Sequence, residues 1–358
     1  MLHRRGGPAG LMLGYLLARA GVDVVVLEKH DDFLRDFRGD TIHPSTLTVL
    51  DDLGLLEAFL QLPHQEVREL TGEVYGETVT IADFTHLPAP RPFMVLIPQW
   101  DFLDFIAAQA QRLPNFALRM ATQALGVIED GARVVGVEAK TAAGPLAVHA
   151  DLVVATDGRH STLRGSAGLA SDDLGAPIDV LWFRLPRNAA RDPSRTGGTI
   201  RPGAMLVTLN RDSYWQCACV IPKGALPARW YRDGLLCIGD AAHAMSLVGG
   251  VGINLAIQDA VAASNLLAQP LRERRLCSHD LAAVQRRRDW PARVTQRAQI
   301  AIHNEVLAPT LAGTAAPGRV PLAVTLQQRL PLLRRLPARL VGMGVRPERV
   351  RTLPQRRE

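Results

Sequence analysis

Cysteine is scarce in this chain of 358 residues, which contains four cysteines and no C-x-x-C pair. The spacing argues against a disulfide reductase and favours free thiols over a disulfide or a metal site. Cys217 and Cys219 alternate along a predicted strand, so both should point to one face as small, buried and reduced side chains. The remaining two, Cys237 and Cys277, stand apart. Free thiols of this kind fit a reducing, cytoplasmic compartment.

Lysine and aromatic residues are also rare. Lysine occurs only at Lys29, Lys140 and Lys223, and Phe, Trp and Tyr together make up 5% of the chain. The formal charge of +6 comes from arginines, which cluster after Leu271 and between Arg329 and Arg357. A nucleic-acid surface interleaves such cations with aromatic side chains, and these clusters hold few of them. We therefore interpret the arginines as a compositional bias and expect no nucleic-acid partner.

Targeting signals are not evident either. The basic start is interrupted by a glycine turn and is not followed by a small-residue cleavage site, so a signal peptide is not expected. The longest apolar stretch contains Asn254, Gln258 and Asp259, which a bilayer would penalise. The sequence thus predicts no membrane span.

The first half of the chain alternates helical and strand patterns. Apolar residues recur at helical spacing over Pro8–Ala20, His43–Leu62 and Trp100–Leu113. The continuous apolar run Val22–Glu28 is typical of a buried strand. Three strands between Phe116 and Ala150, the first covering residues 116–129, predict a β-meander.

The second half adds an antiparallel layer. A buried strand ends at Asp157-Gly158, and three alternating strands follow over residues 178–185, 204–210 and 213–221. A strand, a glycine-rich loop and a long helix come next, over residues 234–268. The predicted fold class is therefore α/β: a Rossmann-like nucleotide-binding domain with a β-meander, an inserted and mainly antiparallel β domain, and C-terminal helices.

A glycine turn opens the chain. The dinucleotide fingerprint G-x-G-x-x-G aligns on Arg5, Gly7 and Gly10, so two of its three glycines are present. Glu28 ends the next strand, where a carboxylate can accept hydrogen bonds from ribose hydroxyls. Only four residues precede Arg5, so we expect the first strand of the unit to be missing and the turn to be strained.

Two further strands end in an aspartate. Asp157 and Asp240 would lie at the carboxyl edge of a parallel sheet, where ligands of α/β folds bind. Gly249, Gly250 and Gly252 then precede a long helix, whose first N–H groups suit a group that becomes anionic. His243 beside this loop is either structural or catalytic, and the residues favour the structural interpretation.

In this order, the motifs resemble the FAD-dependent aromatic monooxygenases of the para-hydroxybenzoate hydroxylase type, the group A flavoprotein monooxygenases. The matching segments are Gly7/Gly10, Glu28, "DGRHSTLR" from Asp157, and "GDAAHAMSLVGGVGIN" from Gly239. "FRGDTIHPSTL" and "IPQWDFL" are also similar to family segments. The resemblance implies that Arg38 and Gln99 lie near the flavin.

The resemblance also implies the chemistry. FAD would lie extended, with its adenosine at Glu28, its ribityl chain near Asp240 and its ring near Gly250, Gly252 and Asn254. NAD(P)H would reduce it, and O₂ would supply the oxygen that hydroxylates an aromatic or polyketide-like small molecule. No catalytic acid or base is marked by spacing, and no metal is expected.

The implied domains are discontinuous. Residues 1–70, 99–176 and 226–310 would form the FAD-binding domain, and residues 71–98 and 177–225 a shortened β-sheet domain for substrate. Residues 311–358 would form a basic helical tail.

Three departures leave alternatives open. Arg5 replaces a turn glycine, Leu247 stands where the family commonly has a proline, and the passage from Gly224 to Gly234 is short. A shortened cover would admit water and waste the activated oxygen as peroxide. The alternatives are an NAD(P)H oxidase without productive hydroxylation and a degenerate, non-catalytic family member.

Overall fold

The computed structural model describes most of the chain. Arg5, Arg38, Leu247 and Gly249 lie outside the described part. The described residues are 2–4, 7–33, 41–74, 77–158, 161–169, 179–188, 197–201, 204–210, 214–221, 229–243, 250–302 and 329–353.

A six-stranded sheet forms the centre of the α/β domain. Its order is β17-β18-β12-β1-β2-β8, and all neighbours are parallel except β17 and β18. The strands are β1 (Leu2–Arg4), β2 (Val24–Leu27), β8 (Phe116–Arg119), β12 (Val153–Ala155), β17 (Tyr231–Arg232) and β18 (Leu235–Cys237).

The expectation that the first strand is missing is wrong. Leu2–Arg4 forms β1, which pairs with β2 on one side and with β12 on the other. Three residues are enough here because both neighbours are parallel strands that supply hydrogen bonds. The centre of the sheet is therefore closed, and no sheet edge is left between β2 and β12.

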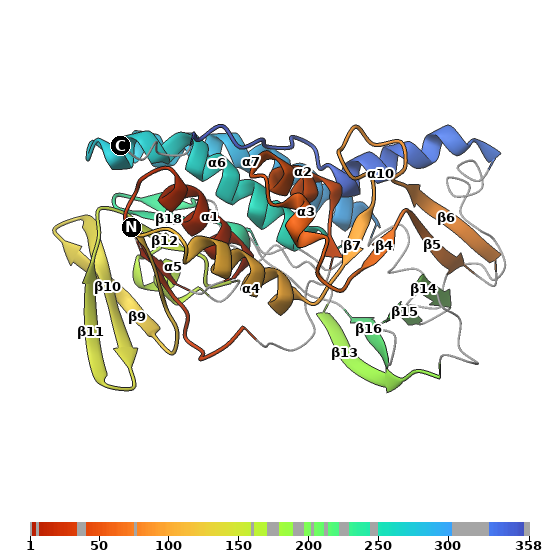
Figure 1. The fold of residues 1–358 in the computed structure, drawn as a ribbon, viewed down its shortest axis with the longest axis horizontal. Coiled ribbons are helices and arrows are strands. Elements are labelled where there is room, and N and C mark those ends of the chain that lie inside the picture. The colour runs from red at the N-terminus through yellow and green to blue at the C-terminus, as the bar shows by residue number, and fades with distance from the viewer. Residues whose placement is uncertain are drawn as a thin grey trace.

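Helices cover this sheet. The first, α1 (Pro8–Arg19), packs between α4 (Gln99–Ala110) and α6 (Val251–Arg272), and α7 (Ser278–Ile302) lies against α6 (Figure 1). Gly14 lets α1 approach closely, because a Cβ there would lie 3.0 Å from side-chain atoms of Val26 and Phe116. Ten consecutive residues of α1 are buried, so this helix and α6 form the middle of the largest apolar cluster.

The long apolar helix α6 is internal. It is the one helix in the described ranges with the length and hydropathy of a membrane span, but 67% of its most apolar window is buried inside the protein. Its polar residues Asn254, Gln258 and Asp259 are also buried. Core helices meet the same two criteria, so α6 packs as part of the protein interior.

The β-meander contains β9, β10 and β11, but its first strand differs from the prediction. The run 116–129 divides into β8, which joins the central sheet beside β2, and β9. Ala121, with a φ of 48°, stands in the break between them. The meander strands are β9 (Gln123–Asp130), β10 (Arg133–Thr141) and β11 (Gly144–His149).

A second six-stranded sheet lies at the other end of the molecule (Figure 1). Its order is β13-β16-β15-β14-β5-β6, antiparallel except for the parallel pair β14 and β5, so the mainly antiparallel layer of the predicted fold class is present. The strands are β5 (Glu69–Val74), β6 (Glu77–Asp83), β13 (Asp179–Pro186), β14 (Gly197–Arg201), β15 (Ala204–Asn210) and β16 (Tyr214–Ile221).

Smaller elements join the two sheets. A three-stranded sheet of order β3-β7-β4 connects them, and short helices flank it. These elements are β3 (Thr41–Ile42), α2 (Pro44–Asp52), α3 (Leu56–Phe59), β4 (Gln65–Val67) and β7 (Met94–Leu96). Elsewhere, α5 (Thr162–Ser166) packs against β9, η1 (Gly239–Ala241) against α6, and η4 (Pro331–Arg334) and α10 (Arg335–Gly342) against β6.

The C-terminal segment returns to the α/β domain. From α10 it runs back along α6 and α7 (Figure 1). Residues 344–353 carry no helix, although the sequence suggested a helical tail. Arg349 makes an ion pair with Asp52 at the end of α2, and Asn265 of α6 hydrogen-bonds the backbone of Arg349 and Arg351. The Arg349 side chain and the backbone of this segment therefore dock it.

Three of the cysteines have described side chains. Cys217 and Cys237 are buried free thiols, whereas Cys277 is exposed. Burial raises the pKa of Cys237 to about 12, so this side chain is a neutral, apolar part of β18. Among the residues with described positions, no group of His, Cys, Asp or Glu has the arrangement of a metal site.

Candidate functional site

The loops that carry the sequence motifs meet at one edge of the central sheet. Arg4 pairs with both Leu27 and Ala155, and Ala155 pairs with Cys237, so four parallel strands end level with one another. Glu28, Asp157 and Asp240 follow these strand ends within three residues. At about 4.8 Å between neighbouring strands, β18 and β2 are roughly 14 Å apart. The motifs therefore form one row along the carboxyl edge.

The amino end of α1 lies in the middle of this row. Gly7 is the N-cap in an extended conformation, no side chain caps the helix, and Pro8 occupies its first turn. The amide of Leu11 donates to the carbonyl of Gly7, so the amides of Ala9 and Gly10 precede the first helical hydrogen bond. A Cβ at Gly7 would meet nothing within 4 Å. Open space and free N–H groups at a helix start suit a phosphate group.

Glu28 stands at one end of the row, directly after β2. Its backbone is fixed on both sides, because its amide donates to Arg119 and its carbonyl accepts from Thr122, both at 2.8 Å. The side chain is 4% exposed, and its Oε1 accepts a hydrogen bond from the amide of His30. A carboxylate has two oxygens and several acceptor positions, so it is a suitable partner for hydroxyl groups.

The Asp157 stretch is a capped helix start. The Asp157 carboxylate accepts hydrogen bonds from the Ser161 hydroxyl and, at 2.7 and 3.3 Å, from the amides of Thr162 and Leu163 at the start of α5. The Ser161 hydroxyl in turn accepts the amide of Arg164. These bonds assign to Asp157 a role in shaping the loop, so we expect any contact with a cofactor to come mainly from the backbone around Gly158.

Arg164 connects this loop to the next one. Its side chain is buried, and Nη1 donates a 2.8 Å hydrogen bond to the carbonyl of Ala241 in η1. The two motifs are 77 positions apart in the chain. The spacing D-x-x-x-S-x-x-R therefore encodes a helix cap and a hydrogen bond that holds the turn formed by residues 239–243.

The glycine–aspartate turn, residues 239–243, follows β18. Gly239 has a φ of 59°, and a Cβ there would lie 3.1 Å from Ala256 of α6 and 3.3 Å from Ala9 of α1. Asp240 is exposed, whereas its neighbours Gly239 and Ala241 are buried. The turn thus presents one carboxylate at the point where both helices begin.

The start of α6 lies against Thr41 of β3. Gly250 caps it in the left-handed region, with a φ of 62°, and a Cβ there would lie 2.4 Å from the Thr41 hydroxyl. The Asn254 side chain is saturated by the protein, accepting from the His43 amide and the Thr46 hydroxyl at 2.8 and 2.7 Å and donating to Thr41 at 3.1 Å. Gly252 faces open space, because a Cβ there would meet nothing within 4 Å.

The two residues expected near the flavin from the family resemblance are Gln99 and Arg38. Gln99 is the first residue of α4 and is partly exposed. Arg38 lies outside the described residues, as do Leu247 and Gly249. The sequence did not single out Gly14 or Thr41, although both are sites of close packing next to the row.

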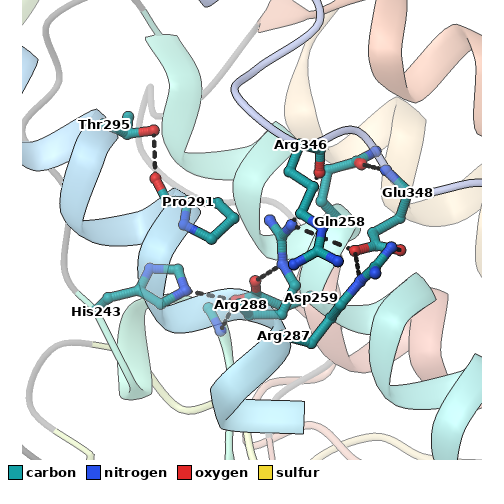
Figure 2. A network of polar contacts seen from close by, with 10 residues as sticks. His243, Gln258, Asp259, Arg287, Arg288, Pro291, Thr295, Arg346 and Glu348 are labelled. Carbon is teal, nitrogen blue, oxygen red and sulfur yellow. Dashed lines mark hydrogen bonds and ion pairs between the residues drawn. The ribbon is translucent and has the colours of Figure 1, made fainter. Parts of the chain in front are cut away.

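A buried charge network lies beneath the glycine–aspartate turn (Figure 2). Asp259 of α6 accepts hydrogen bonds from His243 Nε2 at 2.5 Å, from the amide of Gly239 at 3.1 Å and from Arg288 Nε at 2.8 Å. Burial by itself raises the pKa of Asp259, but the facing His243 and Arg288 outweigh burial and hold that pKa below its usual value. His243, 1% exposed, is therefore a structural residue of the turn.

These features fit an extended dinucleotide such as FAD. Two glycines leave room for a ligand at Gly7 and Gly252, two helix starts offer free amides, and Glu28 and Asp240 offer carboxylates for hydroxyl groups. Gly7, Glu28 and Asp240 follow strands of the central sheet at one edge, and the start of α6 with Gly252 lies beside Thr41 of β3. The residues present thus provide acceptors, donors and open backbone in the order that such a ligand needs.

Comparison with known proteins identifies the family. Residues 6–218 and 222–298 match the model of the FAD-binding domain family FAD_binding_3. This match covers both the α/β domain and the second sheet.

Individual relatives agree. The chain is 32% identical to 6-methylpretetramide 4-monooxygenase of Streptomyces rimosus, over 97% of this chain and 93% of the relative. It is 30% identical to para-nitrophenol 4-monooxygenase of a Pseudomonas species, over 71% and 74%. The alignment with the first relative spans 391 positions and exceeds the 358 residues of this chain, so that relative carries residues with no counterpart here.

A solved structure shows the same fold. Anhydrotetracycline hydroxylase from Streptomyces rimosus superposes with a TM-score of 0.79 at 21% identity, over 96% of this chain and 76% of that one. The family match, the relatives and the row of motifs along the sheet edge lead to the same conclusion. This chain belongs to the FAD-dependent aromatic monooxygenases of the para-hydroxybenzoate hydroxylase type.

Proposed function

We propose that this monooxygenase hydroxylates a fused-ring, polyketide-like aromatic molecule, with NAD(P)H as reductant and O₂ as the oxygen source. One observation carries the substrate class: a relative that is 32% identical over nearly the whole length of both chains is a 6-methylpretetramide 4-monooxygenase. An anhydrotetracycline hydroxylase shares the fold. When bound, FAD supplies the redox chemistry, transferring electrons from NAD(P)H to O₂ and one oxygen atom to the ring.

Different residues of the row bind different parts of FAD. Glu28 accepts hydrogen bonds from the adenosine ribose, and the amides at the start of α1, after Gly7, face the pyrophosphate. Asp240, exposed beside both helix starts, accepts hydroxyl groups of the ribityl chain. Gln99 and Arg38 are assigned to the same ligand by their motifs.

The start of α6 is assigned to the reacting end of FAD, the flavin ring. Gly250 turns the chain sharply, and the amides of Gly252 and its neighbours lie at the positive end of a helix of 22 residues. Such a helix end stabilises negative charge that develops on a ligand edge beside it. Asn254 fixes this helix start to Thr41 and His43 and thereby sets its orientation.

The second sheet is assigned to the substrate. Residues 71–98 contribute most of β5, all of β6 and, outside this sheet, β7, and residues 177–225 contribute β13–β16. Residues 1–70, 99–176 and 226–310 are assigned to the flavin. The parallel pairing of β5 with β14 joins both parts of the substrate layer into one sheet. The partners of this function are a small aromatic molecule and O₂. The free thiols fit a cytoplasmic setting.

A combined binding and product assay tests this function. Purified protein should bind FAD and become yellow, and 6-methylpretetramide or anhydrotetracycline should accelerate NAD(P)H oxidation. With isotopically labelled O₂, mass spectrometry should find one labelled oxygen atom in the product. Protein that binds no FAD would refute the proposal, and so would NAD(P)H consumption that yields only hydrogen peroxide with both substrates.

A further inference from the structure

The C-terminal segment reaches the glycine–aspartate turn through buried charges. Arg288 of α7 donates to Asp259 on one side, and on the other it faces the C-terminal segment (Figure 2). There its Nη1 donates to the carbonyl of Arg346 at 3.2 Å and lies 3.7 Å from Glu348 Oε1. A guanidinium thus bridges the carboxylate beneath the turn and the carboxylate of a segment far along the chain.

Glu348 is held firmly in this position. Arg287 forms a fork with it, Nε to Oε1 at 2.7 Å and Nη2 to Oε2 at 2.9 Å. The amide of Glu348 also donates to the side-chain oxygen of Gln258 on α6. Glu348 therefore has both a charged partner and a backbone anchor, as a residue that orients others requires.

Burial makes the network dependent on all its members. Asp259 is fully buried, Arg288 is 1% exposed and Glu348 is 3% exposed. An ionised group without a partner is very costly at such a depth, so each charge needs its neighbour in place. Asp259 is an acceptor, so Nε2 of His243 carries a proton, whereas Nδ1 has no hydrogen-bond partner in the described part of the chain.

We propose that Glu348 is a positioning residue for the flavin site. It orients Arg288, Arg288 orients Asp259, and Asp259 holds the amide of Gly239 and the ring of His243. The turn that presents Asp240 is therefore set by a carboxylate that follows the matched family region, which ends at residue 298. This inference rests on the proposed role of the turn in binding FAD.

The coupling must act in both directions. If docking of residues 346–349 favours the turn geometry that binds FAD, then FAD binding must stabilise the docked segment by the same free energy. Hydrogen exchange on the wild-type protein measures this without a mutation. FAD should slow exchange of the amides of Arg346, Glu348 and Arg349 more than exchange of the Ala150 amide of the meander, which donates to Val135. Equal slowing at both places would contradict the coupling.

A matched pair of variants tests the route. Glu348→Gln removes the charge that faces Arg288, whereas Asp52→Asn removes the charge that anchors Arg349 in the same segment, at 2.6–2.9 Å and away from Asp259. The dissociation constant of FAD is measured for each apoprotein by quenching of flavin fluorescence. We expect Glu348→Gln to raise it about tenfold and Asp52→Asn less than about twofold.

The outcomes separate the two hypotheses. Wild-type protein that binds no FAD would refute the proposed function. If the wild type binds FAD and folded Glu348→Gln protein binds it equally well, the positioning role is wrong. A similar loss in both variants would also overturn it, because docking in general and not the Glu348–Arg288 route would then govern binding. If Glu348→Gln does not fold, the exchange experiment on the wild type decides.

Discussion

Arg164 Nη1 donates a 2.8 Å hydrogen bond to the carbonyl of Ala241 and so connects two loops of the proposed flavin site. Removing the guanidinium leaves a buried carbonyl without its donor, at a cost of about 1–3 kcal/mol. We therefore expect Arg164→Met to lower the free energy of unfolding by about 2 kcal/mol and to weaken FAD binding, since the glycine–aspartate turn loses its clamp. Denaturant titration and FAD titration measure the two effects.

Arg232 offers the matched control. Its Nη1 donates to the carbonyl of Ala167, also at 2.8 Å, but at the far end of α5 and away from the sheet edge. Arg232→Met should destabilise the protein without changing the FAD dissociation constant. If both variants bind FAD as the wild type does, the clamp has no part in binding.

Substitution of Gly252 distinguishes an effect on folding from an effect on FAD binding. A Cβ there meets nothing within 4 Å, and alanine is the better helix former by up to about 1 kcal/mol. Gly252→Ala should therefore leave the free energy of unfolding unchanged or slightly raised, while it weakens FAD binding by occupying space beside the ligand. Gly165→Ala in α5, also with open space around it, is the control and should leave FAD binding unchanged. Equal FAD affinity in Gly252→Ala and wild-type protein would remove Gly252 from the site.

The order of the motifs could be predicted because parallel strands end at one edge. Glu28, Asp157 and Asp240 each follow a buried apolar run, so the α/β pattern alone places them together. The strand Leu2–Arg4 could not be predicted, since three residues carry no periodicity and their stability comes from strands on both sides. Phe116–Arg119 was assigned to the meander because Ala121, where the chain turns, is not a residue that signals a turn.

The buried charge network could not be predicted from the sequence, for a different reason. Asp259 and Arg288 lie on separate helices 29 positions apart, and Glu348 is 61 positions beyond Arg287. No short motif encodes such pairs, and an arginine-rich composition conceals the few arginines that are buried. The acid Asp259 within an apolar helix was the one available signal, because an ionised residue there requires a partner.

Gly239 should be intolerant of a side chain. Its φ of 59° costs an L-residue about 1–2 kcal/mol, and a Cβ would also lie 3.1 Å from Ala256 and 3.3 Å from Ala9. Gly168, with a φ of 68° and nothing within 4 Å, has the strain without the contacts. In denaturant titrations Gly239→Ala should therefore lose more stability than Gly168→Ala. Equal losses would show that helix packing adds nothing at the turn.

His43 should make the stability of the protein depend on pH. Burial lowers its pKa from 6.5 to about 4, and its Nδ1 donates to the carbonyl of Val341 in α10 at 2.7 Å. Between these two pKa values, His43 binds a proton in the unfolded chain but not in the folded chain. The His43 contribution to the free energy of unfolding is therefore fully present above pH 6.5 and is lost as the pH drops toward 4.

The size of this effect follows from the two pKa values. Between pH 7 and pH 5 the His43 contribution amounts to a loss of about 2 kcal/mol. His43→Asn keeps a donor for Val341 but cannot titrate, so its free energy of unfolding should fall less over the same interval. Parallel pH profiles for His43→Asn and wild-type protein would show that His43 is protonated as readily in the folded state as in the unfolded chain.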